Sequence, residues 1–85
     1  MDIKNYSPNV RVYRDDKLIF QIWPDKSNHN YIAMKVHSDE ALAHVINKYV
    51  VMPENGDTNH EIIYARVRGS DYDQFKKEGS VWYIL

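Results

Sequence analysis

The side chains that could carry chemistry in this sequence begin with its four histidines, His29, His37, His44 and His60. Histidine ligates metals and acts as a general base near neutral pH. These four follow no spacing typical of a metal site, and they fall in polar loops or on the outer side of a predicted helix. We therefore interpret them as surface residues. An alternative, which the sequence leaves open, pairs His29 or His60 with Glu61 across neighbouring loops.

Acidic residues form three close pairs, and each pair has a structural explanation. One pair lies where the pattern predicts an exposed turn. The other two lie where it predicts the first turn of a helix, and carboxylates there complement the helix dipole. We therefore assign none of them to a catalytic or metal site. In that order the pairs are Asp15 with Asp16, Asp39 with Glu40, and Asp71 with Asp73.

Motifs of several enzyme classes are missing from the sequence. It has no cysteine, which excludes disulfides, thiolate metal sites and a cysteine nucleophile. Its three glycines, Gly56, Gly69 and Gly79, are not spaced as in a phosphate-binding loop. Its serines lack the strand-turn-helix context of a nucleophile elbow. We therefore predict a protein that is not an enzyme and that has no catalytic residue, no metal and no cofactor.

A set of tyrosines, arginines and a lysine is the pattern that does suggest a binding site. Successive residues of a strand point to opposite sides of a sheet. If the aliphatic residues of three predicted strands pack under the helices, the residues that alternate with them share the opposite side. The aliphatic set is Val10, Val12, Ile32, Val36, Ile63 and Val67. The opposite set, which we call the Tyr/Arg face, is Arg11, Tyr13, Tyr31, Lys35, Tyr64 and Arg66.

Three interpretations of the Tyr/Arg face stay open at this point. Tyrosine and arginine are enriched at protein interfaces, because they combine large contact area with directional hydrogen bonding. The same side chains could stack on bases or clamp phosphate groups. The face could also be a solvated sheet surface on which these side chains pack only against one another.

The elements that must position this face are predicted from apolar periodicity and turn residues. Asp15 and Asp16 predict an antiparallel hairpin, and Asn55–Gly56 is a strong type I′ turn signal. Five apolar residues in succession at the last strand predict a central strand or one covered on both faces. The predicted strands are Val10–Arg14, Lys17–Trp23, Tyr31–His37, a short Val50–Met52, Ile62–Val67 and Val81–Leu85.

Two helices are predicted, each with a capping serine at its start. Ser38 caps the first helix, and Ser70 caps a shorter one that buries Tyr72 and Phe75 and stops at Gly79. On the first helix the apolar residues at i, i+3, i+4 and i+7 are Leu42, Val45, Ile46 and Tyr49, and we expect them to be buried together with Phe20, Ile63 and Val81.

The element order β-β-β-α-(β)-β-α-β predicts an α+β protein with a mostly antiparallel sheet of four to six strands and both helices on one face. We expect one domain over residues 1–85, with residues 1–9 as a tail or edge segment, in a complete small gene product. The chain is 85 residues long and 44% hydrophobic, which suffices for one core. A domain of this size buries only roughly 60% of its unfolded surface, so a homodimer would add stability.

Charge and hydropathy limit the kinds of partner that we expect. The net charge of −1 gives no global attraction to nucleic acid or to acidic membranes. No apolar run approaches the ~20 residues of a membrane span, and the polar N-terminus is not a signal peptide. We therefore expect a cytoplasmic protein without a membrane partner.

Three classes of function follow. The first is a non-enzymatic protein-binding module, an inhibitor or regulator that contacts another protein through the Tyr/Arg face; phage and mobile-element proteins that block host systems belong to this class. The second is a binder of a nucleotide, of another anionic small molecule or of single-stranded nucleic acid. The third is a small metal-independent nuclease. We favour the first, because catalytic motifs are missing and 13% of the residues are aromatic.

Overall fold

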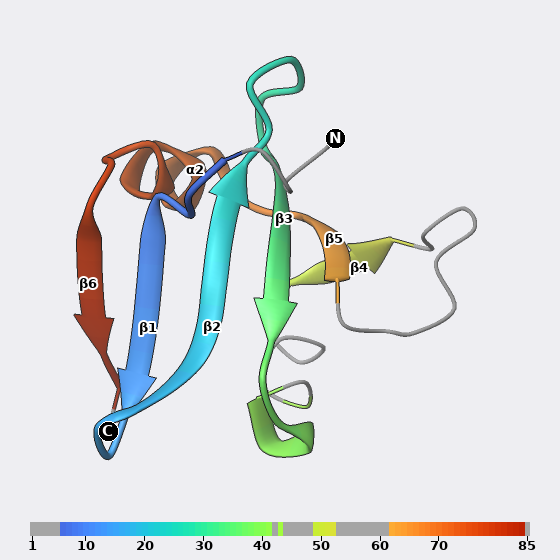
Figure 1. Cartoon of the computed structure of the whole chain (residues 1–85). Coiled ribbons are helices and arrows are strands. Elements are labelled where there is room, and N and C mark those ends of the chain that lie inside the picture. Colours follow the sequence, from blue (N-terminus) through green and yellow to red (C-terminus); the bar gives the residue numbers. More distant parts are fainter. Residues whose placement is uncertain (1–5, 42, 44–48, 53–61, 85) are drawn as a thin grey trace.

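The computed structural model describes residues 6–41, 43, 49–52 and 62–84, and its sheet has six strands (Figure 1). Strands lie next to one another in the order β4-β5-β3-β2-β1-β6, and all neighbours are antiparallel except β1 and β6, which are parallel. The chain is therefore an α+β protein with a mostly antiparallel sheet, as predicted. The elements are β1 (Val10–Arg14), β2 (Lys17–Pro24), β3 (Tyr31–Val36), β4 (Val50–Met52), β5 (Ile62–Arg66), α2 (Gly69–Phe75) and β6 (Ser80–Tyr83).

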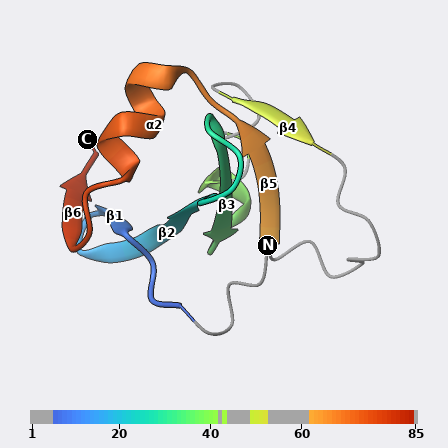
Figure 2. The same cartoon turned by 90° about the horizontal axis from the view of Figure 1, so that it is seen from above.

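Two helices pack on one side of this sheet. Residues 39–41 and 43 are helical and belong to the first helix. Ala41 of this helix, and Tyr72 and Phe75 of α2, join the same cluster of buried side chains as residues from β1, β2, β3 and β5. Figure 2 shows α2 over the end of the sheet that holds β2, β1 and β6. The ring of Phe75 lies 5.2 Å from that of Trp82, centre to centre, so α2 covers the core side of β6.

Most of the predicted core is confirmed. Two of its members are half-buried and pack against the core, namely Val36 and Tyr49. The prediction that Val81 is buried is wrong, because this residue is 50% exposed. Three members lie outside the described residues, namely Leu42, Val45 and Ile46. The predicted residues that are buried are Val10, Val12, Phe20, Ile32, Ile63 and Val67.

The hairpin of β1 and β2 turns at Asp15 and Asp16, as predicted. Arg14 pairs with Lys17, which leaves a two-residue loop. The φ angles of Asp15 and Asp16 are 51° and 63°. Two positive φ angles define the type I′ turn, whose twist matches that of the flanking strands, and aspartate tolerates this conformation better than most residues.

A β-bulge in β2 changes the side to which Ile19 points. Val12 pairs with Phe20, but the next residue, Tyr13, pairs with Leu18, so Ile19 is an extra residue in the ladder. Ile19 packs against the core cluster, whereas strict alternation predicts it on the side opposite Phe20. The extra residue shifts the period-two pattern by one position, which explains the difference.

Helix α2 starts before the serine that was predicted to cap it. Its N-cap residue is Arg68, which has an extended backbone and makes no side-chain cap bond. The carbonyl of Arg68 accepts the N–H of Tyr72 at 2.9 Å. The predicted Ser70 cap is therefore wrong. The N–H of Val67 donates to the carbonyl of Asn30 at 2.8 Å, which fixes the end of the extended segment, and the helix begins directly after it.

The other predicted helix ends are closer to the structure. Oγ of Ser38 accepts the N–H of Ala41 at 3.0 Å, which confirms Ser38 as the cap of the first helix. Helix α2 ends at Phe75, earlier than the predicted stop at Gly79. Gly79 has a φ of 77° and so supplies the left-handed residue in the turn that leads to β6.

Asn9 joins the start of β1 to three other elements. Its N–H donates to the carbonyl of Ile22, and its carbonyl accepts the N–H of Ser80, both at 3.0 Å. Its side-chain amide donates to the carbonyls of Phe75 and Lys76, at 3.3 Å each. These carbonyls have no partner inside the helix, so Asn9 closes the end of α2 and fixes β6 beside β1.

Strand β6 lies at an edge of the sheet, which corrects the prediction of a central or doubly covered strand. It pairs in parallel with β1, and no described strand lies on its other side. Trp82 and Ile84 pack against the core, whereas Val81 and Tyr83 are 50% and 69% exposed. An edge strand over a one-sided core needs apolar residues on one side only. Because the exposed side of β6 is apolar as well, the sequence of this strand does not show the alternation of apolar and polar residues that is typical of an edge strand.

The segment between the helices is described in part. Strand β4 confirms the predicted short strand and pairs antiparallel with β5. The Asn55–Gly56 turn lies outside the described residues. Within the described part of the chain, no helix has the length and hydropathy needed to cross a membrane.

Candidate functional site

The pairing of the strands places all members of the Tyr/Arg face on the side of the sheet away from the helices. Arg11 pairs with Gln21, and Gln21 with Lys35. Tyr31 pairs with Arg66. Paired residues of neighbouring strands point to the same side, and residues two positions apart in one strand do so as well, which adds Tyr13 and Tyr64.

This face has two groups of residues, one on β1 and one on β3 and β5, and buried side chains interrupt part of the surface between them. Trp23 of β2 and Ala33 of β3 pair with each other on the same side of the sheet, and they are only 8% and 0% exposed. The indole N–H of Trp23 donates to the carbonyl of Tyr6 at 2.9 Å, so the segment before β1 covers the middle of the face. Arg11 and Tyr13 lie on β1, and the other four residues lie on β3 and β5. Lys35 of the second group stays linked to Arg11 through the half-buried Gln21, which pairs with both.

Strand β6 adds two residues to the smaller group. Val81 pairs with Arg11, and Tyr83 pairs with Tyr13. The rings of Tyr13 and Tyr83 stack, with centres 5.7 Å apart and planes 28° from parallel. Val81 and Tyr83, together with Tyr6, are the large hydrophobic residues that are most exposed in the described part of the chain. We call Arg11, Tyr13, Val81 and Tyr83 the edge patch.

Arg11 differs from its neighbour Arg14 in its charge partner. Arg14 forms an ion pair with Glu40 at the start of the first helix. No carboxylate of the described residues lies within ion-pair distance of Arg11. The guanidinium of Arg11 therefore has donors for a carboxylate or carbonyl brought by another molecule.

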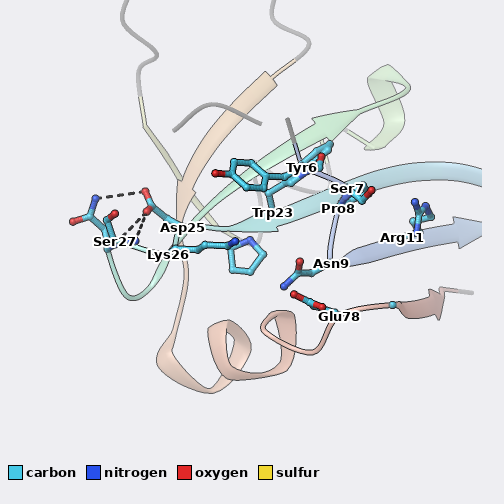
Figure 3. Close-up of a pocket in the computed structure, with 13 residues that line it drawn as sticks. Tyr6, Ser7, Pro8, Asn9, Arg11, Trp23, Asp25, Lys26, Ser27 and Glu78 are labelled. Carbon is cyan, nitrogen blue, oxygen red and sulfur yellow. Dashed lines mark hydrogen bonds between the residues drawn. The ribbon is translucent and has the colours of Figure 1, made fainter. Parts of the chain in front are cut away.

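A groove of about 770 Å³ opens beside Arg11 at one end of the sheet (Figure 3). Three segments form it: the one before β1, the turn between β2 and β3, and the turn after α2. Figure 3 shows Tyr6 and Trp23 side by side on one wall, and Nζ of Lys26 lies 4.6 Å from the centre of the Tyr6 ring. We call this the end groove; it is lined by Arg11 and by residues 6–9, 23–28 and 78–79.

Charges of both signs line the end groove. Arg11 and Lys26 are opposed by Asp25 and Glu78. The Asp25 carboxylate already accepts the N–H of Ser27 at 2.8 Å, within the turn after β2. The groove therefore offers aromatic surface without a strong net charge.

Each of the described histidines contacts a neighbouring polar side chain. Nε2 of His29 lies 3.6 Å from Oδ1 of Asp73, and Nε2 of His37 lies 3.0 Å from Oε1 of Gln21. Among the residues that the structure describes, no group of three or more His, Cys, Asp and Glu is placed to hold a metal. The pairing of a histidine with Glu61 stays a hypothesis, because His44, His60 and Glu61 lie outside the described residues.

Two tyrosines have raised pKa values, and both are parts of the core side. Burial raises the pKa of Tyr72, and the charges of Asp25 and Asp73 add to the effect. The hydroxyl of Tyr72 donates to the backbone carbonyl of Asp25. Burial also raises the pKa of Tyr49 to about 12, with a further contribution from Asp71. Both phenols therefore stay protonated at neutral pH.

Comparison of the chain with models of protein families, with curated proteins and with solved structures gave no match. The geometry defines a small α+β protein with an aromatic and cationic surface at one sheet edge. Sequence reasoning found Arg11 and Tyr13 but missed Val81 and Tyr83. An apolar run carries no signal for an edge strand, and the partner strand lies at the other end of the sequence.

Proposed function

We propose that this protein is a non-enzymatic protein-binding module, an inhibitor or regulator of its partner, and that it binds through the edge patch. The observation that carries the proposal is the exposure of Val81 and Tyr83, 50% and 69%, beside Arg11 and Tyr13. Single exposed apolar residues are ordinary, but adjacent ones with an arginine on one face are typical of interaction sites.

The edge patch has the chemistry of an interface centre. Tyrosine and arginine contribute most of the binding energy at many interfaces, because they fill partner pockets and donate hydrogen bonds there. The stack of Tyr13 on Tyr83 restrains both rings before binding. Restraint matters because each side chain immobilised on binding costs about 0.5–1.5 kcal/mol. Arg11 supplies a planar group of donors at the side of the stack.

A second candidate function, binding of a nucleotide or another anionic small molecule or of single-stranded nucleic acid, is favoured by the end groove. Its volume of about 770 Å³ lies within the range of ligand sites, and Arg11 and Lys26 could contact phosphate. Two features weigh against it. Asp25 and Glu78 repel an anion in the same groove, and Trp23, only 8% exposed, offers little ring surface for a base.

The proposal is tested by quantitative capture of proteins from a lysate of the source cells. Wild type is compared with the double variant Arg11→Ala/Tyr83→Ala. The matched control, Tyr64→Ala/Arg66→Ala, removes the same residue types from the other group of the face. We expect a protein that wild type and control retain, and that the edge-patch variant retains at least tenfold less, as loss of two such residues predicts.

Folding and salt dependence complete the test. Circular dichroism and thermal unfolding must show that both double variants are folded. A partner retained equally by the edge-patch variant would contradict the proposal. Binding of nucleic acid or nucleotide with a steep loss of affinity at rising salt would favour the second candidate, whereas a flat response favours a protein partner.

A further inference from the structure

The open edge of β6 carries backbone groups that point away from the sheet. The N–H groups of Ser80 and Ile84 donate to carbonyls on the β1 side, at 3.0 and 2.9 Å. Successive peptide groups of a strand point to opposite sides. The N–H and C=O groups of Val81 and Tyr83 therefore point outward, where no described strand receives them. We propose that this edge pairs antiparallel with the β6 edge of a second copy of this chain.

Strand β6 is short, with four residues, but it carries none of the side chains with which proteins protect an open edge. Lysine, proline, inward charges and bulges discourage the pairing of one edge with another. The strand reads Ser-Val-Trp-Tyr over Ser80–Tyr83, without charge or proline. Its neighbour β1, by contrast, carries Arg11 and Arg14. The edge strand thus has the composition of a strand that is covered.

One register makes β6 complementary to itself. If Trp82 lies on a twofold axis, Val81 of each copy is opposite Tyr83 of the other. These are the residues whose backbone groups point outward, so each such pair can exchange two hydrogen bonds. A tyrosine opposite a β-branched residue is also a favourable cross-strand pair. Twofold symmetry repeats every one of these contacts.

The helix side of the edge also fits this register. There, Ile84 of one copy is opposite the small residue Ser80 of the other. A groove of about 530 Å³ lies along this part of β6, next to Ser80 and Trp82. It gives room for the branched side chain of Ile84, which is only half-buried in its own chain. The wall opposite β6 is formed by Asp73 and Gln74 of α2 and by Lys77 of the turn after it.

The contact is small, so we expect a weak dimer. One strand from each copy buries less than the roughly 1,600 Å² of a standard interface, so the dimer should dissociate on dilution. In the dimer the two edge patches lie side by side on one face of a continuous sheet. The inference concerns the edge of the sheet and the proposed function concerns its face, so one can fail while the other holds.

Sedimentation of the full chain tests the inference, over concentrations from about 10 µM to about 1 mM, where small interfaces associate. The weight-average mass should rise from the 10.1 kDa of one chain towards twice that value. Amide hydrogen exchange, followed by NMR, should slow with concentration at Val81 and Tyr83. It should not change at Trp82, whose N–H points towards β1.

Two variants should remain monomeric, with an association constant at least tenfold lower. Val81→Pro removes an outward N–H, and an edge strand tolerates proline at such a position. Tyr83→Lys places a charge on the edge at a residue that is mostly exposed. Arg66→Ala, on the other group of the face, should associate as wild type does.

Several results would overturn the inference. One is a wild-type mass of 10.1 kDa over the whole range, and another is association of the variants that equals wild type. A dimer in which the Val81 and Tyr83 amides exchange at the monomer rate would place the contact elsewhere. Protection of these amides only after addition of a different protein would assign the edge to that protein. If Val81→Pro unfolds, Tyr83→Lys and the exchange rates decide.

Discussion

Replacement of Phe75 by alanine should lower the free energy of unfolding by about 3–5 kcal/mol. The side chain is 1% exposed, and its ring lies 5.2 Å from that of Trp82 and 6.4 Å from that of Tyr49. A buried aromatic side chain removes about 150–250 Å² from water, which corresponds to roughly 4–6 kcal/mol at about 25 cal/mol per Å². Alanine keeps a small part of this, and loss of the ring contacts adds about 0.5–1.5 kcal/mol per pair.

Such a loss is large for this chain, because a domain of 85 residues is stable by about 4–13 kcal/mol in total. The substitution should also disturb the edge patch, since Phe75 packs against Trp82, and Trp82 packs against the core from β6. Urea unfolding followed by tryptophan fluorescence measures the loss. Phe75→Leu is the control, and it should cost about 1.5 kcal/mol or less, because the core keeps most of its volume.

This reasoning would be refuted if Phe75→Ala lowered the free energy of unfolding by less than about 1 kcal/mol while the slope of that free energy against urea concentration stayed unchanged. Removal of a fully buried ring should cost more. NMR adds a second check. The signals of Val81 and Tyr83 should shift more in Phe75→Ala than those of Tyr31, which lies on β3. Equal shifts would mean that α2 does not support β6 in particular.

Three further predictions test other parts of the structure. Arg66→Ala should change the free energy of unfolding by less than about 0.5 kcal/mol, because Arg66 is exposed; a loss clearly above about 0.5 kcal/mol in thermal unfolding would contradict it. Asp16 has a φ of 63°, so Asp16→Gly should stabilise the folded protein by about 0.5 kcal/mol and Asp16→Val should destabilise it by about 1 kcal/mol or more. Urea unfolding in which the valine variant is more stable than the glycine variant would be decisive against the type I′ turn. Tyr49 should ionise near pH 12 in the folded protein and near pH ~10 when unfolded. The stability from its raised pKa is therefore complete below pH ~10 and is lost as the pH rises towards 12; a tyrosinate absorbance titration that Tyr49→Phe leaves unchanged above pH ~11 would count against this.

The parts of the fold that follow from local patterns were predictable from the sequence. Val10 and Val12 alternate with Arg11 and Tyr13, and the structure buries the two valines. Two aspartates between two alternating runs predict a tight hairpin, and Asp15 occupies such a turn. The first helix is capped by its serine as expected. In each case the deciding interactions join residues that are near in sequence.

Most of the rest depends on contacts between distant segments. The exposure of Val81 follows from the position of β6 at the edge, which the pairing of β6 with β1 decides. The interruption of the Tyr/Arg face follows from Trp23, which is covered because its indole N–H donates to the carbonyl of Tyr6. The side of Ile19 follows from a bulge that places Tyr13 opposite Leu18. The first two features follow from contacts between segments that are separated in the sequence. The bulge lies within the β1–β2 hairpin, but period-two alternation carries no mark of the extra residue.

The candidate site was predictable to the same degree. Alternation alone put the six members of the Tyr/Arg face on one side, and the pairing of the strands agrees with it. The edge patch could not be derived in this way. It joins Arg11 to Val81 through a parallel pair, and parallel neighbours need a long connection that leaves no turn signal between them.

Pairing of β1 with β6 also has a consequence for the chain during its synthesis. The hairpin of β1 and β2 can close within about 1–10 µs once both strands are made. Roughly 55 residues separate the end of β2 from the start of β6, and at about 5–20 residues per second they take about 3–11 s to add. For that time the other side of β1 is an open edge. Arg11 and Arg14 lie on this strand, and charged side chains on an open edge discourage pairing with foreign strands. Arg11 should therefore protect the nascent chain from aggregation before it becomes part of the edge patch.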